Sequence, residues 1–171
     1  LYNYKNLQVS SFQSGRAEIR NAASSRIWGL EANLRYKLSD AFTLTSGVAY
    51  THARYRSFKN APYYAYCDPA VVVTASNMYC ANGAGGLTQT TIDGSGFHMQ
   101  RAPDFTATLG ANYTTALAEG KLTLSGNLYY TSKVFLDPTQ QFPQKAYETL
   151  SLRAQWEDPS QHFTVAVFGD N

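Results

Sequence analysis

The sequence lacks any apolar run long enough to form a membrane-spanning helix. Charged residues make up only 15% of its 171 residues, against about 25% in typical soluble domains. Mean hydropathy is -0.33, the value of an ordinary soluble chain. The net charge is +2, and the basic residues are scattered along the chain. This scatter excludes the basic stripe of a nucleic-acid-binding surface, so we expect no nucleic-acid partner.

Signatures of catalysis, phosphate binding and metal ligation are missing as well. The glycine-rich stretch at residues 83–86 is not followed by the Lys-Ser/Thr pair of a phosphate-binding loop. His52, His98 and His162 lie far apart and show no metal-ligand spacing. No serine stands in a nucleophile elbow. We therefore expect a protein that is not an enzyme and that holds no metal ion.

The sequence does contain strict alternation of apolar and polar residues. Across residues 27–38 one parity is apolar, and the other is polar apart from Ile27 and Gly29. A period of two is typical of a β-strand with one apolar and one polar face. The apolar parity consists of Trp28, Leu30, Ala32, Leu34, Tyr36 and Leu38.

The same pattern predicts further strands. They cover residues 42–55, 103–113, 121–131, 149–157 and a stretch that begins near residue 162. Residues 1–12 form another strand, in which the apolar parity changes between Tyr4 and Leu7; a β-bulge would explain the change. Most of these strands exceed the five or six residues of ordinary strands. About ten residues tilted by about 45° cover roughly 23 Å of the membrane normal, close to the apolar band of an outer-membrane barrel.

The connections alternate between short and long. Residues 39–40, 115–120 and 157–161 are short and polar and predict tight hairpin turns. Residues 13–26, 56–101 and 132–147 are longer, and residues 82–96 have the composition of a flexible loop. Consecutive antiparallel strands place every second connection at one end, so the long loops share a rim, as the extracellular loops of outer-membrane barrels do.

Aromatic residues lie near the strand ends, where they fit the interfacial girdles of such barrels. The alternative is that aromatic residues are simply good strand formers. These residues are Tyr36, Phe42, Tyr113, Tyr130, Trp156 and Phe163.

These features predict an all-β fold, namely an antiparallel transmembrane β-barrel segment of about seven up-and-down strands. Single-chain bacterial barrels have even strand numbers from eight upward, so we expect part of a larger barrel. The side chains expected to point into hydrocarbon are Trp28, Leu34, Leu109, Leu128 and Leu152. A soluble all-β binding domain is an alternative, and it predicts a polar exterior.

The connection at residues 56–101 holds the main candidate site. Its tyrosines offer amphipathic surface to a ligand, or they pack loop against loop; they are Tyr63, Tyr64, Tyr66 and Tyr79. Cys67 and Cys80 are the only cysteines. A disulfide closing a loop of about 14 residues would contribute roughly 3 kcal/mol in the chain-entropy model. We favour it over free thiols because both cysteines fall in an outer loop, in a compartment where disulfides persist. We favour it over a metal site because no CxxC or histidine pairing is present.

Charged side chains on the predicted polar face form a second candidate set. They solvate a lumen and pair across strands, or they contact a plug or a passing ligand. They are Glu31, Arg35, Asp104 and Arg153.

Several segments resemble the late barrel strands of TonB-dependent outer-membrane receptors. Residues 21–31 resemble the strand start N-A-x-x-x-x-x-x-G-x-E, and residues 50–55 resemble the stretch Y-T-x-A-x-Y. Residues 101–103 resemble the R-x-P that opens a strand after a long loop. Residues 129–132 resemble a late strand, and residues 167–171 resemble the entry to the family's N-L-x-D-x-x-Y signature.

The resemblance implies that residues 1–171 are a partial β-barrel domain from a 22-strand-type barrel, without plug domain, TonB box or closing strand. It implies a siderophore-receptor-like parent in the outer membrane of a Gram-negative bacterium. Such a parent imports a scarce nutrient, most often an iron–siderophore complex, with energy transmitted by TonB. The implied partners are outer-membrane lipid, TonB and a small ligand such as a ferric siderophore. A passive porin or an autotransporter barrel is the other alternative.

Overall fold

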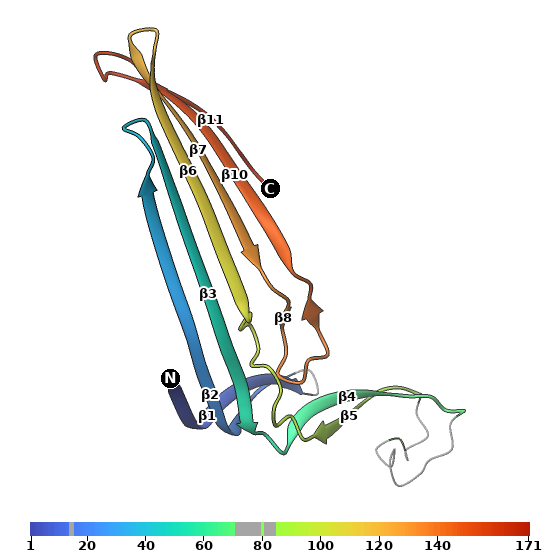
Figure 1. Cartoon of the computed structure of the whole chain (residues 1–171). Helices are drawn as coiled ribbons and strands as arrows, with labels where there is room; N and C mark the ends of the chain where they lie inside the picture. Colours follow the sequence, from blue (N-terminus) through green and yellow to red (C-terminus); the bar gives the residue numbers. More distant parts are fainter. Residues whose placement is uncertain (14–15, 71–79, 81–84) are drawn as a thin grey trace. The chain divides into compact units, whose positions relative to one another are not determined.

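The structure is a computed structural model that describes residues 1–13, 16–70, 80 and 85–171. These residues form strands joined by turns and loops (Figure 1). In this part of the chain no helix is long and apolar enough to cross a membrane. The chain divides into two compact units. We call residues 1–28, 52–102 and 134–144 the loop unit, and residues 29–51, 103–133 and 145–171 the strand unit.

The main sheet has seven strands in the order β1-β2-β3-β6-β7-β10-β11. Its strands are β1 (Tyr2–Gln13), β2 (Arg16–Lys37), β3 (Phe42–Ser57), β6 (Phe105–Leu117), β7 (Gly120–Thr131), β10 (Tyr147–Glu157) and β11 (Thr164–Asp170). Two separate two-stranded sheets accompany it. One pairs β4 (Ala61–Cys67) with β5 (Gly86–Ile92), and the other pairs β8 (Val134–Phe135) with β9 (Pro143–Gln144). The predicted all-β class and the seven antiparallel strands are confirmed.

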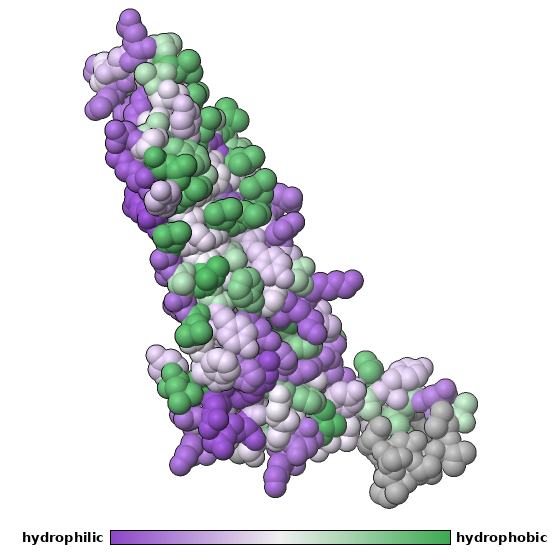
Figure 2. All heavy atoms as spheres, viewed as in Figure 1, coloured by the Kyte–Doolittle hydropathy of each residue, from purple (hydrophilic) through white to green (hydrophobic). Residues whose placement is uncertain are grey.

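The strand register of the strand unit separates an apolar face from a polar one, because paired residues of neighbouring strands share a face. Leu109 pairs with Leu128, which pairs with Leu150. Next to this row, Leu152 pairs with Gly126. Leu109, Leu128, Leu150 and Leu152 are all exposed. Figure 2 shows apolar side chains gathered along the long strands.

The opposite face of these strands carries hydroxyl and amide groups. Thr45, Gly110, Asn127 and Ser151 form one row across β3, β6, β7 and β10. A Cβ atom on Gly110 would lie 2.5 Å from the hydroxyl oxygen of Thr45, so the row needs glycine there.

Aromatic side chains pair at the ends of the strands. Ring centroids of Phe42 and Tyr113 lie 6.5 Å apart, and those of Trp156 and Phe163 lie 5.7 Å apart. The indole nitrogen of Trp156 also donates to the carbonyl oxygen of Leu117, at 2.8 Å. An aromatic ring with a polar tip suits a membrane interface, where one side is apolar and the other is wet.

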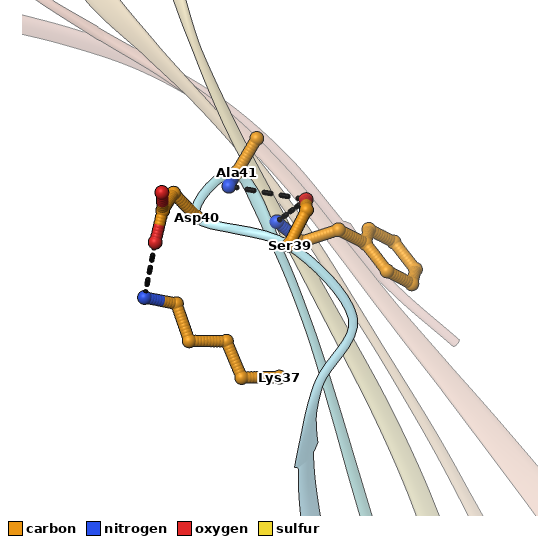
Figure 3. Close-up of polar contacts among 5 residues, drawn as sticks. Lys37, Ser39, Asp40 and Ala41 are labelled. Carbon is orange, nitrogen blue, oxygen red and sulfur yellow. Dashed lines mark hydrogen bonds and ion pairs between the residues drawn. The ribbon is translucent and has the colours of Figure 1, made fainter.

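The β2–β3 turn shows how short polar connections close the hairpins (Figure 3). The Ser39 hydroxyl accepts hydrogen bonds from the backbone N–H groups of Ala41 and Phe42, at 3.2 and 3.1 Å. Lys37 and Asp40 form an ion pair at 2.6 Å. Both charged side chains are exposed, so solvent screens the pair and it contributes little to stability. The serine therefore defines the turn.

Three local expectations are wrong. Residues 16–26 are not a connection but the first half of β2, and they pair with β1 from Gln13↔Arg16 onward. Their small and polar side chains hide the period of two, while backbone pairing to β1 holds them extended. No bulge interrupts β1, because the pairs Lys5↔Ser24 and Leu7↔Ala22 keep the same register; Asn6 instead adopts a φ of 57°.

The third error concerns the expected loop at residues 82–96. Residues 86–92 form β5, which pairs with β4. Threonines in β5 favour a strand, and the glycines that suggested a loop lie at or beyond its ends.

Candidate functional site

The loop unit has its own apolar core. Val9, Tyr55, Phe58 and Ala61 are buried together. Partly buried apolar side chains surround them, namely Leu7, Ile92, Phe97 and Met99. The long connection is therefore packed, with side chains from β1, β3, β4 and β5 in its core, and is not an open loop.

The segment after β5 folds back along the end of β3. The N–H of Tyr55 donates to the carbonyl oxygen of Phe97 at 3.0 Å, and the N–H of Met99 donates to that of Ala53 at 3.1 Å. The N–H of Phe58 donates to the hydroxyl of Ser95 at 2.9 Å. These bonds satisfy backbone groups at the end of β3 and fix the base of the β4–β5 hairpin.

The β4–β5 hairpin separates the predicted tyrosines between its two faces, because successive residues of a strand point to opposite sides. Tyr64 and Tyr66 share one face, and Tyr63 lies on the other. Tyr66 pairs with Leu87, and their side chains are 73% and 74% exposed. Tyr79 lies outside the described residues.

A disulfide joins Cys67, the last residue of β4, to Cys80. Cys67 is buried and pairs across the hairpin with Gly86, the first residue of β5. The covalent link therefore attaches at the end of the hairpin that lies away from the core of the loop unit.

The connection after β7 is bound to the hairpin through Gln141. The backbone N–H of Tyr64 donates to Oε1 of Gln141 at 2.8 Å, and Nε2 of Gln141 donates to the carbonyl oxygen of Tyr64 at 2.6 Å. Farther along, the N–H of Arg101 donates to the carbonyl oxygen of Phe135 at 2.8 Å. The rings of His98 and Phe135 lie 5.4 Å apart. Two connections distant in sequence thus form one body.

The four charged residues expected on the polar face are not gathered into one cluster. Glu31 borders a hollow of ≈ 170 Å³ beside Asn33 and Thr108. Arg153 borders a second hollow, of ≈ 350 Å³, with Asp170. Exposed Arg35 lies on β2. The carbonyl oxygen of Asp104 accepts a bond from the N–H of Thr51 at 2.9 Å.

The hollow of ≈ 350 Å³ has a mixed lining, in which Leu152, Phe168 and two glycines accompany polar side chains. Besides Arg153 and Asp170 it includes Asn112, Ser125, Asn127 and Ser151. Within the described residues, no three His, Cys, Asp or Glu side chains gather where they could hold a metal ion.

A family described as "TonB dependent receptor-like, beta-barrel" matches residues 2–171. The chain belongs to this family. The resemblance to TonB-dependent receptors that the strand motifs indicated is confirmed. No curated protein matches the chain.

Two solved structures match the chain, and the first is described as a siderophore receptor. PiuA from Acinetobacter baumannii is 19% identical, with a TM-score of 0.56 over 90% of this chain and 18% of that one. BauA, the ferric preacinetobactin receptor of the same organism, is 18% identical, with a TM-score of 0.41 over 97% of this chain and 27% of that one. This TonB-dependent receptor chain therefore spans 18% and 27% of the two receptors' lengths.

Sequence reasoning missed Gln141 and the turn that presents it. The signal was present as an internal repeat, since residues 137–142 read DPTQQF and residues 158–163 read DPSQHF. In both hexapeptides the aspartate accepts hydrogen bonds from backbone N–H groups two and five residues later. Gln140 and Gln161, at the fourth position, have φ angles of 63° and 60°.

Proposed function

We propose that this chain is part of an outer-membrane receptor that binds a ferric siderophore at its outer loops and imports it with energy transmitted by TonB. Membership of the TonB-dependent receptor family supports this function. The observation that carries it is that the chain has both a strand unit with rows of exposed leucine on one face and a loop unit with its own packed core. Such a chain suits a wall in lipid that presents a binding surface outside.

The face of the hairpin that carries Tyr64 and Tyr66 is the proposed ligand surface. Tyrosine offers a rigid ring with a hydroxyl, which suits a bulky ligand with both aromatic and polar parts. Tyr66 and Leu87 are highly exposed side by side, so nothing in the described structure covers them. Tyr63 lies on the opposite face and is proposed to pack the loop.

The polar residues of the strand unit are proposed to line the lumen. Their hydroxyl and amide groups, with Glu31 and Arg153 beside the two hollows, form a hydrated wall for a passing ligand or a plug. Neither role involves covalent chemistry. A soluble all-β domain is disfavoured because the rows of exposed leucine on its surface would promote aggregation in water.

Uptake of radioactive iron by cells that express the full-length receptor tests this function. Ferric complexes of a catecholate, a hydroxamate and a carboxylate siderophore serve as probes. We expect one of them to accumulate, and a protonophore to abolish its accumulation. Accumulation that persists without a proton-motive force would instead favour a passive pore, and no accumulation of any probe would refute the siderophore proposal.

Substitution of Tyr66 by alanine tests the ligand surface. Loss of one exposed aromatic contact, worth about 1.4 kcal/mol, weakens binding of the imported probe about tenfold. Tyr36→Ala removes a similarly exposed tyrosine from the strand unit and is expected to leave binding unchanged. Equal affinity of wild type and Tyr66→Ala would remove Tyr66 from the site.

A further inference from the structure

We propose that Gln141 is a positioning residue that fixes the connection after β7 to the β4–β5 hairpin, so that two outer loops hold the ligand surface as one body. The ligand part of this inference rests on the proposed function; the joining of the loops does not. The evidence is the pair of hydrogen bonds between the Gln141 carboxamide and the backbone of Tyr64, at 2.8 and 2.6 Å.

These two bonds reproduce the pairing of a neighbouring strand. A carboxamide carries one acceptor oxygen and N–H donors, as a peptide group does. Tyr64 directs its own N–H and carbonyl oxygen to Gln141, and therefore away from β5. Gln141 thus pairs with the edge of β4 that faces away from β5. Pro62, two residues earlier on the same edge, has no N–H to satisfy.

Hydrogen bonds to Asp137 hold the turn that presents Gln141. Oδ1 of Asp137 accepts a hydrogen bond from the N–H of Phe142 at 2.8 Å, and Oδ2 accepts one from the N–H of Thr139 at 2.9 Å. These bonds close a loop around the side chain of Asp137. Gln141 precedes Phe142 in this closed loop, so its side chain starts from a fixed backbone position.

The second copy of the hexapeptide, residues 158–163, shows that the turn forms without a contact like that of Gln141 with β4. Around Asp158 the same backbone bonds form, with Ser160 and Phe163 as donors. His162 stands where Gln141 stands, and its Nδ1 lies 2.7 Å from the hydroxyl oxygen of Ser160, within its own turn. The turn therefore forms without a bridging glutamine. Gln141 is an addition that serves the contact with β4.

Hydrogen exchange in the full-length receptor tests the contact directly. Gln141→Ala is expected to lower the protection of the Tyr64 amide about tenfold or more, because it removes two hydrogen bonds. The amides of Tyr63 and Ala65 point the other way, toward β5, and are expected to stay protected. His162→Ala is the matched control at the other copy of the turn, and it leaves Tyr64 unchanged.

Gln141→Glu supplies a readout that a general packing role would not give. A protonated carboxyl can accept from the N–H and donate to the carbonyl oxygen of Tyr64, as the carboxamide does, whereas a carboxylate cannot donate. The carboxylate still accepts from the N–H of Tyr64, but it places a negative charge and no donor against the carbonyl oxygen of Tyr64, so we expect Tyr64 protection, corrected for intrinsic exchange, to be near the wild-type value below about pH 4 and lower at pH 7. Wild type and Gln141→Ala are expected to show no such transition.

A distance measurement tests whether the loops act as one body. Spin-label amino acids at the exposed positions Leu87 and Leu136 report on the hairpin and on the other connection. Gln141→Ala is expected to broaden their distance distribution. Unchanged Tyr64 protection or an unchanged distribution would overturn the proposal. So would equal loss of protection at Tyr63, Tyr64 and Ala65, since Gln141 would then maintain the hairpin's fold.

Neither measurement uses a ligand. Failure of siderophore uptake in the wild-type receptor would therefore leave the exchange and distance results intact. Conversely, an unaltered Tyr64 amide would refute the positioning role of Gln141 even in a receptor that imports iron.

Discussion

A charge placed at Leu128 gives a sharp test of which face meets lipid. Leu128 lies on β7, between Leu109 on β6 and Leu150 on β10. If this row lies in hydrocarbon, the substitution Leu128→Arg places a guanidinium among acyl chains. The adjacent residue, Asn127, points to the opposite face and borders the larger hollow. Asn127→Arg is therefore a control at nearly the same depth.

The expected magnitude follows from depth. Arginine on the lipid face of a barrel costs about 2–4 kcal/mol near the bilayer midplane and about 1 kcal/mol or less near the interfaces. Leu128 lies eight residues after the first residue of β7 and three before the last, so the cost of a position inside the bilayer applies. At about 1.4 kcal/mol per factor of ten, the ratio of folded to unfolded receptor falls about 30-fold to about 700-fold. Asn127→Arg can project its side chain into a hydrated hollow and is expected to cost under about 1 kcal/mol.

The assay is denaturant unfolding of the full-length receptor in lipid vesicles, followed by tryptophan fluorescence. Assembly in cells provides a second readout, since a destabilised barrel accumulates less in the outer membrane. The reasoning is refuted if Leu128→Arg and Asn127→Arg cost the same, or if the lumen variant is the more damaging of the two.

Three further predictions concern local structure. Gly29→Ala is expected to destabilise the receptor by about 1–3 kcal/mol, because a Cβ would collide with the backbone carbonyl of Tyr50. Gly126→Ala should cost less in the same unfolding assay, because its Cβ would meet only the movable side chain of Leu152, at 3.2 Å. Hydrogen bonds from the Ser160 hydroxyl, then from the N–H of Phe163, hold the pKa of Asp158 below its usual value. These bonds therefore stabilise the turn above about pH 4, and the stabilisation is lost as the pH falls through the lowered pKa. Exchange of the Phe163 amide should show this loss in the wild type and not in Asp158→Asn. Replacement of Cys67 and Cys80 by serine should increase proteolysis between them, since the link contributes about 3 kcal/mol in the chain-entropy model; an unaltered cleavage rate would count against that estimate.

The strand unit was largely predictable because each strand has one apolar and one polar face. The alternation around Leu109, Leu128 and Leu152 survives in the sequence, since every second side chain meets the same surroundings. Short turns were equally readable, because the Ser39 hydroxyl satisfies two backbone N–H groups within the turn and Asp40 pairs with the nearby Lys37. Both features are local, so no knowledge of distant contacts was needed.

The loop unit was less predictable because its contacts join distant segments. The first half of β2 has no apolar period, and its extended form depends on pairing with β1. The bond between Gln141 and Tyr64 spans 77 residues, and a lone glutamine gives no sign of its partner. The division of the hairpin tyrosines into two faces follows once residues 61–67 are known to be a strand, and that strand is paired with β5 within a connection expected to be a loop.

The central claim is that alternate residues of these strands face lipid and water. Spin labels in the reconstituted full-length receptor measure this directly at Trp28, Leu34, Leu109, Leu128 and Leu152, with neighbours Ile27, Asn33, Thr108, Asn127 and Ser151 as the matched set. We predict that oxygen relaxes the first set strongly while a water-soluble nickel reagent does not, and that the order is reversed for the second. Nickel access at the leucine positions equal to that at their neighbours would contradict the account.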